Sequence, residues 1–339
     1  MNIYGLTLED MISYMESLGS KKFHAEQLFS WLYQKKIHSY EEITDIKKDL
    51  LETIKKDYSI DPLKIVNVEE DVDVCKFLFE LKDLEHIEAV FMKHDYGNSV
   101  CISSQVGCNM GCKFCESGRR KKVRNLESYE MVLQVLMIEE YLHIKISHVV
   151  VMGIGEPFDN YDNLVKFLKI INHPKSLSIG ARHITVSTCG IVPKILEFSK
   201  LDLQINLAIS LHAPNNELRN KIMPINKVYP LEILIPALKK YYDATSRRIT
   251  FEYILLDGVN DGEKEALELS RLVKDLNCYI NLIPYNETNH IEFKRSSTIQ
   301  IMRFYDILKK NKINVTIRRE FGSKISAACG QLRSKKEDV

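Results

Sequence analysis

The first part of the chain carries apolar residues at helical spacing in three successive segments. Thr7 is a suitable N-cap for a helix that begins at Leu8, with Asp10 in its first turn. Apolar stripes predict two more helices, one carrying Phe23, Leu28, Phe29, Trp31 and Leu32 and the next carrying Ile43, Ile46, Leu50, Leu51 and Ile54. We therefore expect residues 1–62 to form a small helical domain.

The pattern then changes to alternation with a period of two, which is typical of strands. Phe77, Phe79 and Leu81 alternate with their neighbours, and so do Val100 and Ile102. We expect short antiparallel strands here, with residues 63–100 forming a connecting β segment that leads into a larger domain over residues 101–339.

After residue 125, helical periodicity alternates with short apolar runs. The predicted strands are 146–152, 182–187, 203–210, 247–255, 279–284 and 314–318. The predicted helices lie near 127–142, 160–172, 191–199, 231–243, 263–276 and 297–310. This order predicts an α/β fold with a parallel sheet, open or closed into a partial barrel, and a functional site at the carboxyl ends of the strands.

Composition and charge narrow the class of protein. The 339 residues are 45% hydrophobic and 27% charged, which is enough apolar material for a sizeable core. The chain has no apolar run of about 18 residues, and its start does not resemble a signal peptide, so we expect a cytoplasmic protein. In that compartment the eight cysteines indicate metal binding or catalysis rather than disulfides. A net charge of +1 means that any nucleic-acid contact would depend on local basic patches.

The strongest chemical signal is the group formed by Cys108, Cys112 and Cys115. Three cysteines at this spacing can bind three irons of a [4Fe–4S] cluster from one loop, leaving the fourth iron without a protein ligand. That iron can chelate S-adenosylmethionine (SAM), and an electron from the cluster then cleaves the sulfonium to give a 5′-deoxyadenosyl radical. Gly107 and Gly111 would let the backbone turn tightly around the cluster.

A structural zinc site is the alternative for these cysteines. Zinc requires four Cys or His ligands, and no further one follows Cys115 within several residues. Cys101 could supply the fourth ligand, so the sequence leaves this alternative open.

Six motifs in order along the chain resemble the RlmN/Cfr family of radical SAM RNA methyltransferases. They are Cys101-Ile-Ser-Ser-Gln-Val-Gly-Cys108, Gly153-Ile-Gly-Glu-Pro157, Ser187-Thr-Cys-Gly190, Ser210-Leu-His-Ala-Pro214, Asn281-Leu-Ile-Pro284 and Ala327-Ala-Cys-Gly-Gln-Leu332. The resemblance covers essentially the whole chain. The segments at 155–157 and 187–190 are more similar to the RlmN branch than to the Cfr branch.

The resemblance implies a fold, an activity and partners. The fold would be a partial (β/α)6 TIM-type barrel of the radical SAM superfamily, preceded by a small helical RNA-binding domain. The activity would be synthesis of 2-methyladenosine in the peptidyl transferase centre of 23S ribosomal RNA and in transfer RNA, with one [4Fe–4S] cluster and two SAM per turnover. A cytosolic electron donor and a disulfide reductant would be needed, and we expect a monomer that does not contact the membrane.

The resemblance also assigns SAM-binding positions, several of which follow predicted strands. Glu156 is an acceptor suited to the ammonium group of SAM, and Gly155 beside it allows close backbone approach. The remaining positions are Ser187, Ser210, Leu211, His212 and Asn286. A serine at a strand end is ordinarily a turn residue, so each position is a weak signal alone and the set is what points to SAM.

Three further residues would perform the transfer. The C2 and C8 carbons of adenine are electrophilic, so the family uses a covalent carrier, a cysteine that is first methylated by SAM. Cys329 matches that carrier, and Cys101 matches the second cysteine, which resolves the adduct by forming a disulfide. Glu88 matches the base that takes the proton from adenine, for which burial would raise the pKa. Without the resemblance, Cys329 would be an ordinary buried cysteine and Glu88 a solvated strand carboxylate.

The RNA contacts predicted from sequence are basic clusters that could equally be solvated surface. They are the lysine pairs 21–22, 35–36, 47–48 and 55–56, the run Arg119–Lys122 with Arg124, Lys294–Arg295, Arg318–Arg319, and Arg333, Lys335 and Lys336. The chain departs from the family at Glu116, Gly118 and Lys121 after the cluster motif, and at Lys324 before the carrier. We interpret the three remaining cysteines, Cys75, Cys189 and Cys278, as core or pocket fillers.

Two other functions remain open at this point. A Cfr-like enzyme would methylate C8 of adenine and protect ribosomes from antibiotics. A non-catalytic iron–sulfur or zinc protein that binds RNA would bind metal without cleaving SAM.

Overall fold

A computed structural model describes residues 1–288, 290–318, 322 and 325–332. It begins with a short 3-10 turn, η1 (Ile3–Gly5), and the helices α1 (Leu8–Ser17) and α2 (Lys22–Tyr33), followed by η2 (Tyr40–Glu42) and α3 (Lys48–Asp57). The side chain of Thr7 accepts from the backbone N–H of Asp10, and the Asp10 carboxylate accepts from the N–H of Thr7. This reciprocal cap confirms the predicted start of α1.

Two details of the predicted helical stripes are wrong. Ile43 and Ile46 are buried, but they precede α3 and pack from the connection rather than from the helix. Phe23 on α2 is 48% exposed, while Leu28, Phe29 and Leu32 are fully buried. Phe23 lies in the first turn of α2, and its side chain projects from a different face than the stripe formed by the later residues.

Four strands form an antiparallel flank to the main sheet, in the order β1 (Lys64–Asp71), β2 (Val74–Glu80), β3 (His86–His94) and β4 (Gly97–Cys101). β4 also pairs in parallel with β7 (His148–Val151), so it joins the flank to the parallel part of the sheet. The predicted alternation around residue 100 is thus the first strand of the parallel sheet as well as the last strand of the flank.

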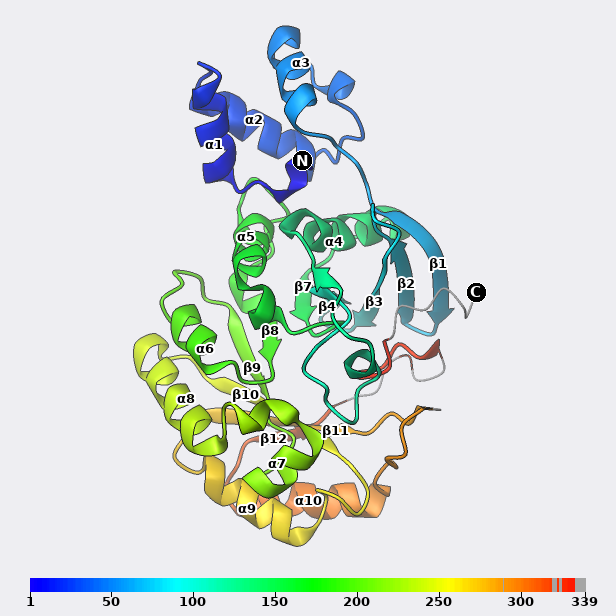
Figure 1. Cartoon of the computed structure of the whole chain (residues 1–339), viewed down its shortest axis with the longest axis vertical. Coiled ribbons are helices and arrows are strands. Elements are labelled where there is room, and N and C mark those ends of the chain that lie inside the picture. Colours follow the sequence, from blue (N-terminus) through cyan, green and yellow to red (C-terminus); the bar gives the residue numbers. More distant parts are fainter. Residues whose placement is uncertain (289, 319–321, 323–324, 333–339) are drawn as a thin grey trace.

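The parallel part continues as β8 (Ile184–Thr188), β9 (Asn206–Ser210), β10 (Ile249–Leu255), β11 (Cys278–Pro284) and β12 (Val315–Ile317), in sequence order. The helices that alternate with these strands are α4 (Ser128–Leu142), α5 (Tyr161–Asn172), α6 (Val192–Phe198), α8 (Leu231–Thr245), α9 (Glu263–Val273) and α10 (Thr298–Lys310). The ten-stranded sheet begins at β1 and ends at β12, and the helices cover its outer face (Figure 1). The predicted α/β class and the partial barrel are confirmed.

Several short elements escaped sequence analysis. They are α7 (Asn216–Ile222), the two-stranded pair β5 (Gln105–Val106) and β6 (Arg124–Asn125), and the 3-10 turns η3 (Glu116–Arg119), η4 (Pro157–Asn160), η5 (Ala181–His183) and η6 (Pro224–Lys227). Each is too brief to show a periodic pattern. Two of them, η3 and η4, supply residues that line the cavity at the carboxyl ends of the strands.

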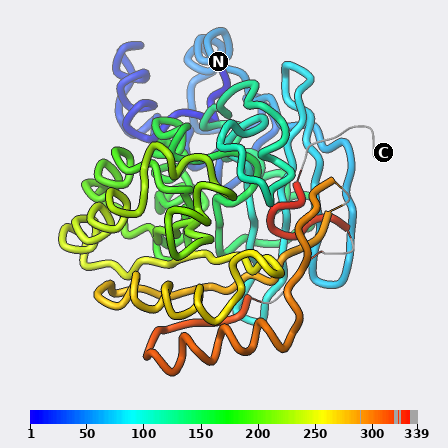
Figure 2. The backbone as a smooth tube through the Cα atoms, turned by 60° about the horizontal axis from the view of Figure 1, so that its bottom comes forward, coloured from blue at the N-terminus to red at the C-terminus, as the bar shows by residue number. Residues whose placement is uncertain are grey.

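One apolar core runs from the N-terminal helices to the sheet and its outer helices. A smaller cluster lies inside the flank and includes Val74, Val90, Met92, Cys101, Ala327 and Leu332. The tail, residues 325–332, therefore packs against the flank strands (Figure 2). Among the described residues, no helix is long and apolar enough to cross a bilayer.

Candidate active site

The loop between β5 and β6 brings the three motif cysteines together. Gly107 and Gly111 have φ values of +73° and +64°, and a Cβ on Gly107 would collide with the carbonyl oxygen of Lys121. Glycine is therefore required by conformation at both positions, as predicted, and by space at Gly107.

Cys108, Cys112 and Cys115 line one cavity of about 910 Å³. Burial raises the pKa of all three thiols, that of Cys108 to about 12, and neighbouring motif cysteines add to the rise at Cys108 and Cys112. Three thiols that repel one another's negative charge are suited to a cationic metal centre, which ligates the deprotonated form.

The donor set fits a cluster better than a single ion. Among the described residues, no group of three or more His, Cys, Asp or Glu side chains has the geometry to hold one metal ion. Cys101, the possible fourth zinc ligand, shares a different cavity with Cys329 and Arg318 and does not line the cavity of the motif cysteines. A [4Fe–4S] cube separates its cysteine ligands more widely than one zinc ion does, so the arrangement favours the cube.

Glu156 lies at the far side of the same cavity, at the N-terminus of η4. Its carboxylate accepts from the backbone N–H groups of Phe158 at 3.0 Å and Cys189 at 2.7 Å. Burial raises the pKa of this carboxyl, and these hydrogen bonds oppose the rise. Gly155 has φ +110°, and any Cβ there would meet Gln105 at 2.6 Å. The two residues thus present an oriented carboxylate on a closely packed turn.

The ends of β8 and β9 supply the other predicted positions. Ser187 and Ser210 line the cavity with their hydroxyl oxygens 3.4 Å apart, and Cys189 lines it as well. Leu211 differs, because its side chain is fully buried in the main core and only its backbone faces other groups. Its N–H donates to Glu252 and its carbonyl accepts from Arg219, so a contact of its side chain with SAM is not supported.

His212 is held as a neutral imidazole. It has φ +57°, and its Nδ1 accepts from the backbone N–H of Ile254 at 3.1 Å. Burial, with a contribution from the charge of Arg219, lowers the pKa of His212 to about 3. The proton of the neutral ring therefore belongs on Nε2, which leaves a donor for a ligand in the cavity that this side chain lines.

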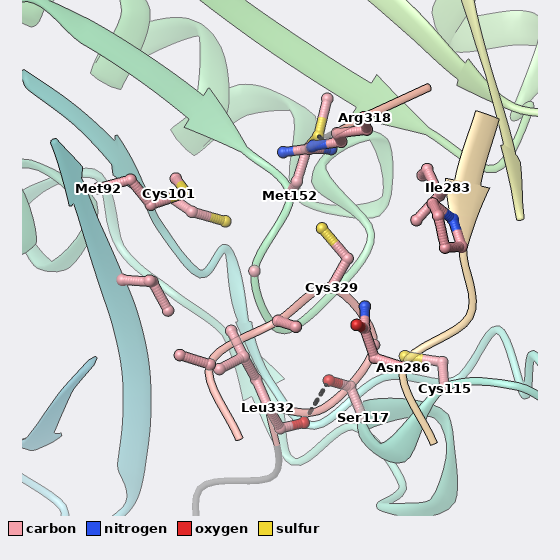
Figure 3. A pocket seen from close by; sticks show the side chains of 16 residues that line it. Met92, Cys101, Cys115, Ser117, Met152, Ile283, Asn286, Arg318, Cys329 and Leu332 are labelled. Carbon is pink, nitrogen blue, oxygen red and sulfur yellow. Dashed lines mark hydrogen bonds between the residues drawn. The ribbon is translucent and has the colours of Figure 1, made fainter. Parts of the chain in front are cut away.

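Cys101 and Cys329 line a second cavity that shares a wall with the first. The shared residues include Cys115, Met152, Arg318 and Cys329. The sulfur atoms of Cys101 and Cys329 point into the same space, although the two residues are far apart in sequence (Figure 3). Burial raises the pKa of the Cys101 thiol to about 12; Cys329 adds to the rise and Arg318 opposes it.

Asn286 lines the second cavity and is buried, and its Oδ1 has no hydrogen-bond partner in the described part of the chain. A buried amide oxygen without a donor indicates a group that is supplied by a ligand. Asn286 and His212 thus offer one acceptor and one donor at the two ends of the combined space.

The tail that carries Cys329 is fixed by hydrogen bonds to the cluster loop. The N–H of Glu116 donates to the Gly330 carbonyl and the Ser117 hydroxyl donates to the Leu332 carbonyl, both at 2.8 Å. Gln331 donates to the carbonyl of Glu287 at 3.1 Å. The departure from the family at Glu116 therefore lies in the seam between loop and tail, whereas Lys324 is outside the described residues.

Glu88 lies on β3 on the same face as Cys101, because Val90 pairs with Cys101 and Glu88 is two residues earlier. It is buried as predicted, but it does not line either cavity. Lys76 approaches its carboxylate at 3.6 Å and pairs with Glu69 at 2.8 Å. The structure thus places Glu88 on the same face of the sheet as Cys101, but outside the wall of the second cavity.

Sequence analysis missed a polar pair inside the sheet, Arg318 and Glu252. Arg318 was predicted to be an RNA contact or a solvated surface charge, yet it lines both cavities, and its Nη1 lies 3.8 Å from Oε2 of buried Glu252. The pKa of Arg318 is raised, chiefly by the negative charge that the Cys329 thiolate would place beside it. Alternation along 314–318, with the strand-end rule, could have indicated that this arginine points inward.

Most of the basic run after the cluster loop is paired within the molecule. Lys122 contacts Asp159 at 2.7 Å, and Arg124 contacts Asp83 at 2.6 Å and Glu130 at 2.7 Å. Arg120 pairs with Glu85. The run therefore mainly forms ion pairs that stabilise the fold. Exposed Lys121 is its most available member for RNA.

Comparison with known proteins agrees with this geometry. The Radical SAM superfamily model matches residues 102–270, so the fold and site define a radical SAM enzyme. The model of the ribosomal RNA large subunit methyltransferase N-terminal domain matches residues 1–60.

The chain belongs to the RlmN family of radical SAM methyltransferases. It is 53% identical to a probable dual-specificity RNA methyltransferase RlmN of Spiroplasma citri, over 100% of this chain and 99% of that protein. The corresponding protein of Listeria monocytogenes is 52% identical, over 98% of this chain and 94% of the relative. The crystal structure of a radical SAM methyltransferase from Sphaerobacter thermophilus superimposes with a TM-score of 0.93 at 40% identity, over 99% of this chain and 100% of that one.

Proposed function

We propose that this chain makes 2-methyladenosine in 23S ribosomal RNA and in transfer RNA, with Cys329 as the methyl carrier and two SAM per turnover. The observation that carries the proposal is that Cys101 and Cys329 share one cavity whose wall continues into the cavity of Cys108, Cys112 and Cys115. A carrier thiol must reach both the SAM site and a second thiol. Among the described cysteines outside the cluster motif, Cys329 is the one that lines both cavities.

The cofactor site follows from the same geometry. Cys108, Cys112 and Cys115 would hold a [4Fe–4S] cluster, and Glu156, Ser187, Ser210, His212 and Asn286 would hold SAM. When bound, the cluster supplies the electron that cleaves SAM to a 5′-deoxyadenosyl radical. Glu156 would accept from the SAM ammonium, and His212 would donate from Nε2.

The chain's own residues then perform the transfer. The Sγ of Cys329 would take the methyl group of one SAM, and S-adenosylhomocysteine would leave. The S-methyl group would then give one hydrogen atom to the 5′-deoxyadenosyl radical from the second SAM, and its carbon would bond to adenine. Glu88 would take the proton from the adenine carbon. The Sγ of Cys101 would bond to the Sγ of Cys329 as the carbon–sulfur bond breaks, the released carbon would take a proton to become the methyl group, and the surplus electron would return to the cluster. A cytosolic reductant would reopen the disulfide.

RNA would bind over residues 1–62 and the mouth of the cavities. Support comes from the match of residues 1–60 to a ribosomal RNA methyltransferase N-terminal domain and from the relatives, which are probable RNA methyltransferases. Residues 63–100 would connect this domain to the barrel of residues 101–339. Exposed lysines near the mouth, among them Lys113 and Lys121, would contact phosphates around an adenine that has left its stack.

The test is anaerobic reconstitution with iron, sulfide, methyl-labelled SAM and transcripts of ribosomal and transfer RNA, followed by nucleoside analysis. The expected product is labelled 2-methyladenosine from both RNAs. 8-Methyladenosine would support the Cfr-like alternative, and absence of 5′-deoxyadenosine would contradict the enzyme altogether. Cys75→Ala is a matched control, because Cys75 lies half-buried on β2 away from both cavities and should leave the product unchanged.

A further inference from the structure

Arg219, on α7, is the largest side chain that is completely buried. Its guanidinium donates to the carbonyl oxygens of Cys189 at 2.7 Å and Leu211 at 3.1 Å. It also donates to the Ser210 carbonyl at 3.3 Å and to Oδ1 of Asn226 at 2.9 Å. These carbonyls belong to the ends of β8 and β9, directly behind the wall that carries Ser187, Ser210 and His212.

All of these partners are neutral, which is unusual for a buried cation. Among the described residues, no carboxylate forms an ion pair with Arg219, and Asn226 is itself held by the amide oxygens of Asn216 and Asn220. Burying a charge without a counter-charge is costly, so such a site indicates an anion that the folded, functioning protein contains. Burial lowers the pKa of Arg219 to about 10, which leaves the side chain charged at neutral pH.

The packing around Arg219 identifies that anion. Cys189, whose carbonyl accepts from Arg219, and Ile222 of α7 pack in one apolar cluster with Cys112 and Cys115 of the cluster motif. The same segment is attached to the cluster loop, because the N–H of Lys113 donates to the carbonyl of Ile222, the last residue of α7, at 2.9 Å. Arg219 therefore presents its charge to the cluster loop from behind the cofactor wall, without lining the cavity.

We propose that Arg219 is the buried counter-charge of the iron–sulfur cluster and sets how readily the cluster accepts an electron. Three thiolates on a [4Fe–4S]²⁺ core leave a net negative charge, and one-electron reduction increases it. A fixed positive charge nearby stabilises the reduced state, because the surrounding interior screens it poorly. This role rests on the proposed cluster at Cys108, Cys112 and Cys115, and Arg219 acts on it as a positioning residue rather than a catalytic one.

The test is a potentiometric titration of the anaerobically reconstituted full chain, without SAM or RNA, using titanium(III) citrate as reductant and electron paramagnetic resonance of the reduced cluster as readout. Arg219→Gln removes the charge and keeps an amide donor. We expect the one-electron equilibrium to move at least about tenfold toward the oxidised cluster, a potential about 59 mV more negative. Arg219→Lys keeps the charge and loses the fork of donors, so its potential should stay nearer that of the wild type.

Arg247→Gln is the matched control. Arg247 is half-buried, donates to Asn206 at 3.2 Å, and precedes β10 at the end of the sheet opposite to the cavities. Its loss should leave the potential unchanged, which separates the position of Arg219 from a general effect of removing a positive charge.

Every other outcome is also decisive. A wild-type potential in Arg219→Gln, or equal shifts in the Gln and Lys variants, would overturn the counter-charge. Loss of iron from both variants would make Arg219 a structural clamp of the strand ends, which also overturns the proposal, whereas iron lost from the Gln variant alone would support it. A wild-type chain that binds no iron would instead remove the proposed cluster, so the two failures are distinguishable by metal content.

Discussion

The two cavities of this enzyme are built in different ways. The cofactor cavity, which the three motif cysteines line, is formed by ends of neighbouring parallel strands. Its polar groups are hydrogen-bonded to one another, as Glu156 is to Cys189 and His212 is to Ile254. The transfer cavity, which Cys101 and Cys329 line, is formed by the flank strands β3 and β4, by ends of parallel strands, and by a tail held through a few hydrogen bonds to the cluster loop. The half around the cluster motif is thus formed by neighbouring strand ends, and the half around Cys101 and Cys329 is assembled from parts distant in sequence.

The sharpest break between the halves is expected from cysteine variants. Cys112→Ala should lose iron and, with it, SAM cleavage and methylation, because a cluster needs three protein ligands. Cys329→Ala should retain iron and SAM cleavage yet yield no methylated adenosine. Metal analysis, 5′-deoxyadenosine release and nucleoside analysis measure the three properties. Methylation that persists in Cys329→Ala would show that the carrier lies elsewhere.

Cys101→Ala should stop the reaction one step later. Without the second thiol, the carbon bridge between Cys329 and adenine cannot be released, so protein and RNA should remain covalently joined. Denaturing gels and mass spectrometry of the tail peptide detect the adduct. Free product at the wild-type rate would remove Cys101 from the resolving step.

Acidification should affect the cofactor half through His212. Its pKa is lowered to about 3 in the fold, against about 6.5 in the unfolded chain, so the unfolded state binds the extra proton between these values. The contribution of neutral His212 to the free energy of unfolding is fully present above about pH 6.5 and falls as the pH decreases. Between pH 7.5 and pH 5.5 the loss from this group is about 1.4 kcal/mol.

Denaturant unfolding of the apoprotein at the two pH values measures this loss. The His212→Gln variant should lack that share of the pH dependence. His38→Gln is the control, because the side chain of His38 is 71% exposed and its replacement should leave the difference as it is in the wild type. Equal pH dependence in the wild type and His212→Gln would contradict a neutral, buried imidazole.

The smallest effect is expected at the contact between the cluster loop and the tail. Ser117→Ala removes one hydrogen bond from the tail, worth about 1 kcal/mol, so methylation should fall about fivefold while SAM cleavage stays intact. Ser199→Ala, which removes a hydrogen bond at the end of α6, is the matched control. A parallel fall in SAM cleavage would indicate that Ser117 supports the cluster loop rather than the tail.

The two halves also differ in how much of each could be predicted from the sequence. The strands and helices after residue 125 were found within a few residues, because their periodic patterns are long, and strand ends of a parallel sheet must share one edge. The proposed cofactor positions other than Leu211, whose side chain lies in the core, line the two cavities at that edge.

The transfer half could not be derived in this way. Nothing local in the sequence places Cys329 beside Cys101, so only the family resemblance linked them. Arg219 was missed because a single arginine in a short helix carries no sign of which way it points, whereas alternation along 314–318 could have indicated the inward direction of Arg318. The pairing of Glu88 with Lys76 depends on strand register, which alternation alone does not fix.

The sheet ends at β1 and β12 without closing, and this gap has a consequence for how such an enzyme can work at all. A small closed barrel is filled by its own side chains and offers no lateral entrance. Here the two edges stand apart, and the segment with Ala327 and Leu332 occupies the inside of the flank. Incomplete closure thus leaves room inside the flank for residues 325–332, so the thiol proposed to carry the methyl group is supplied by the polypeptide that also forms the sheet.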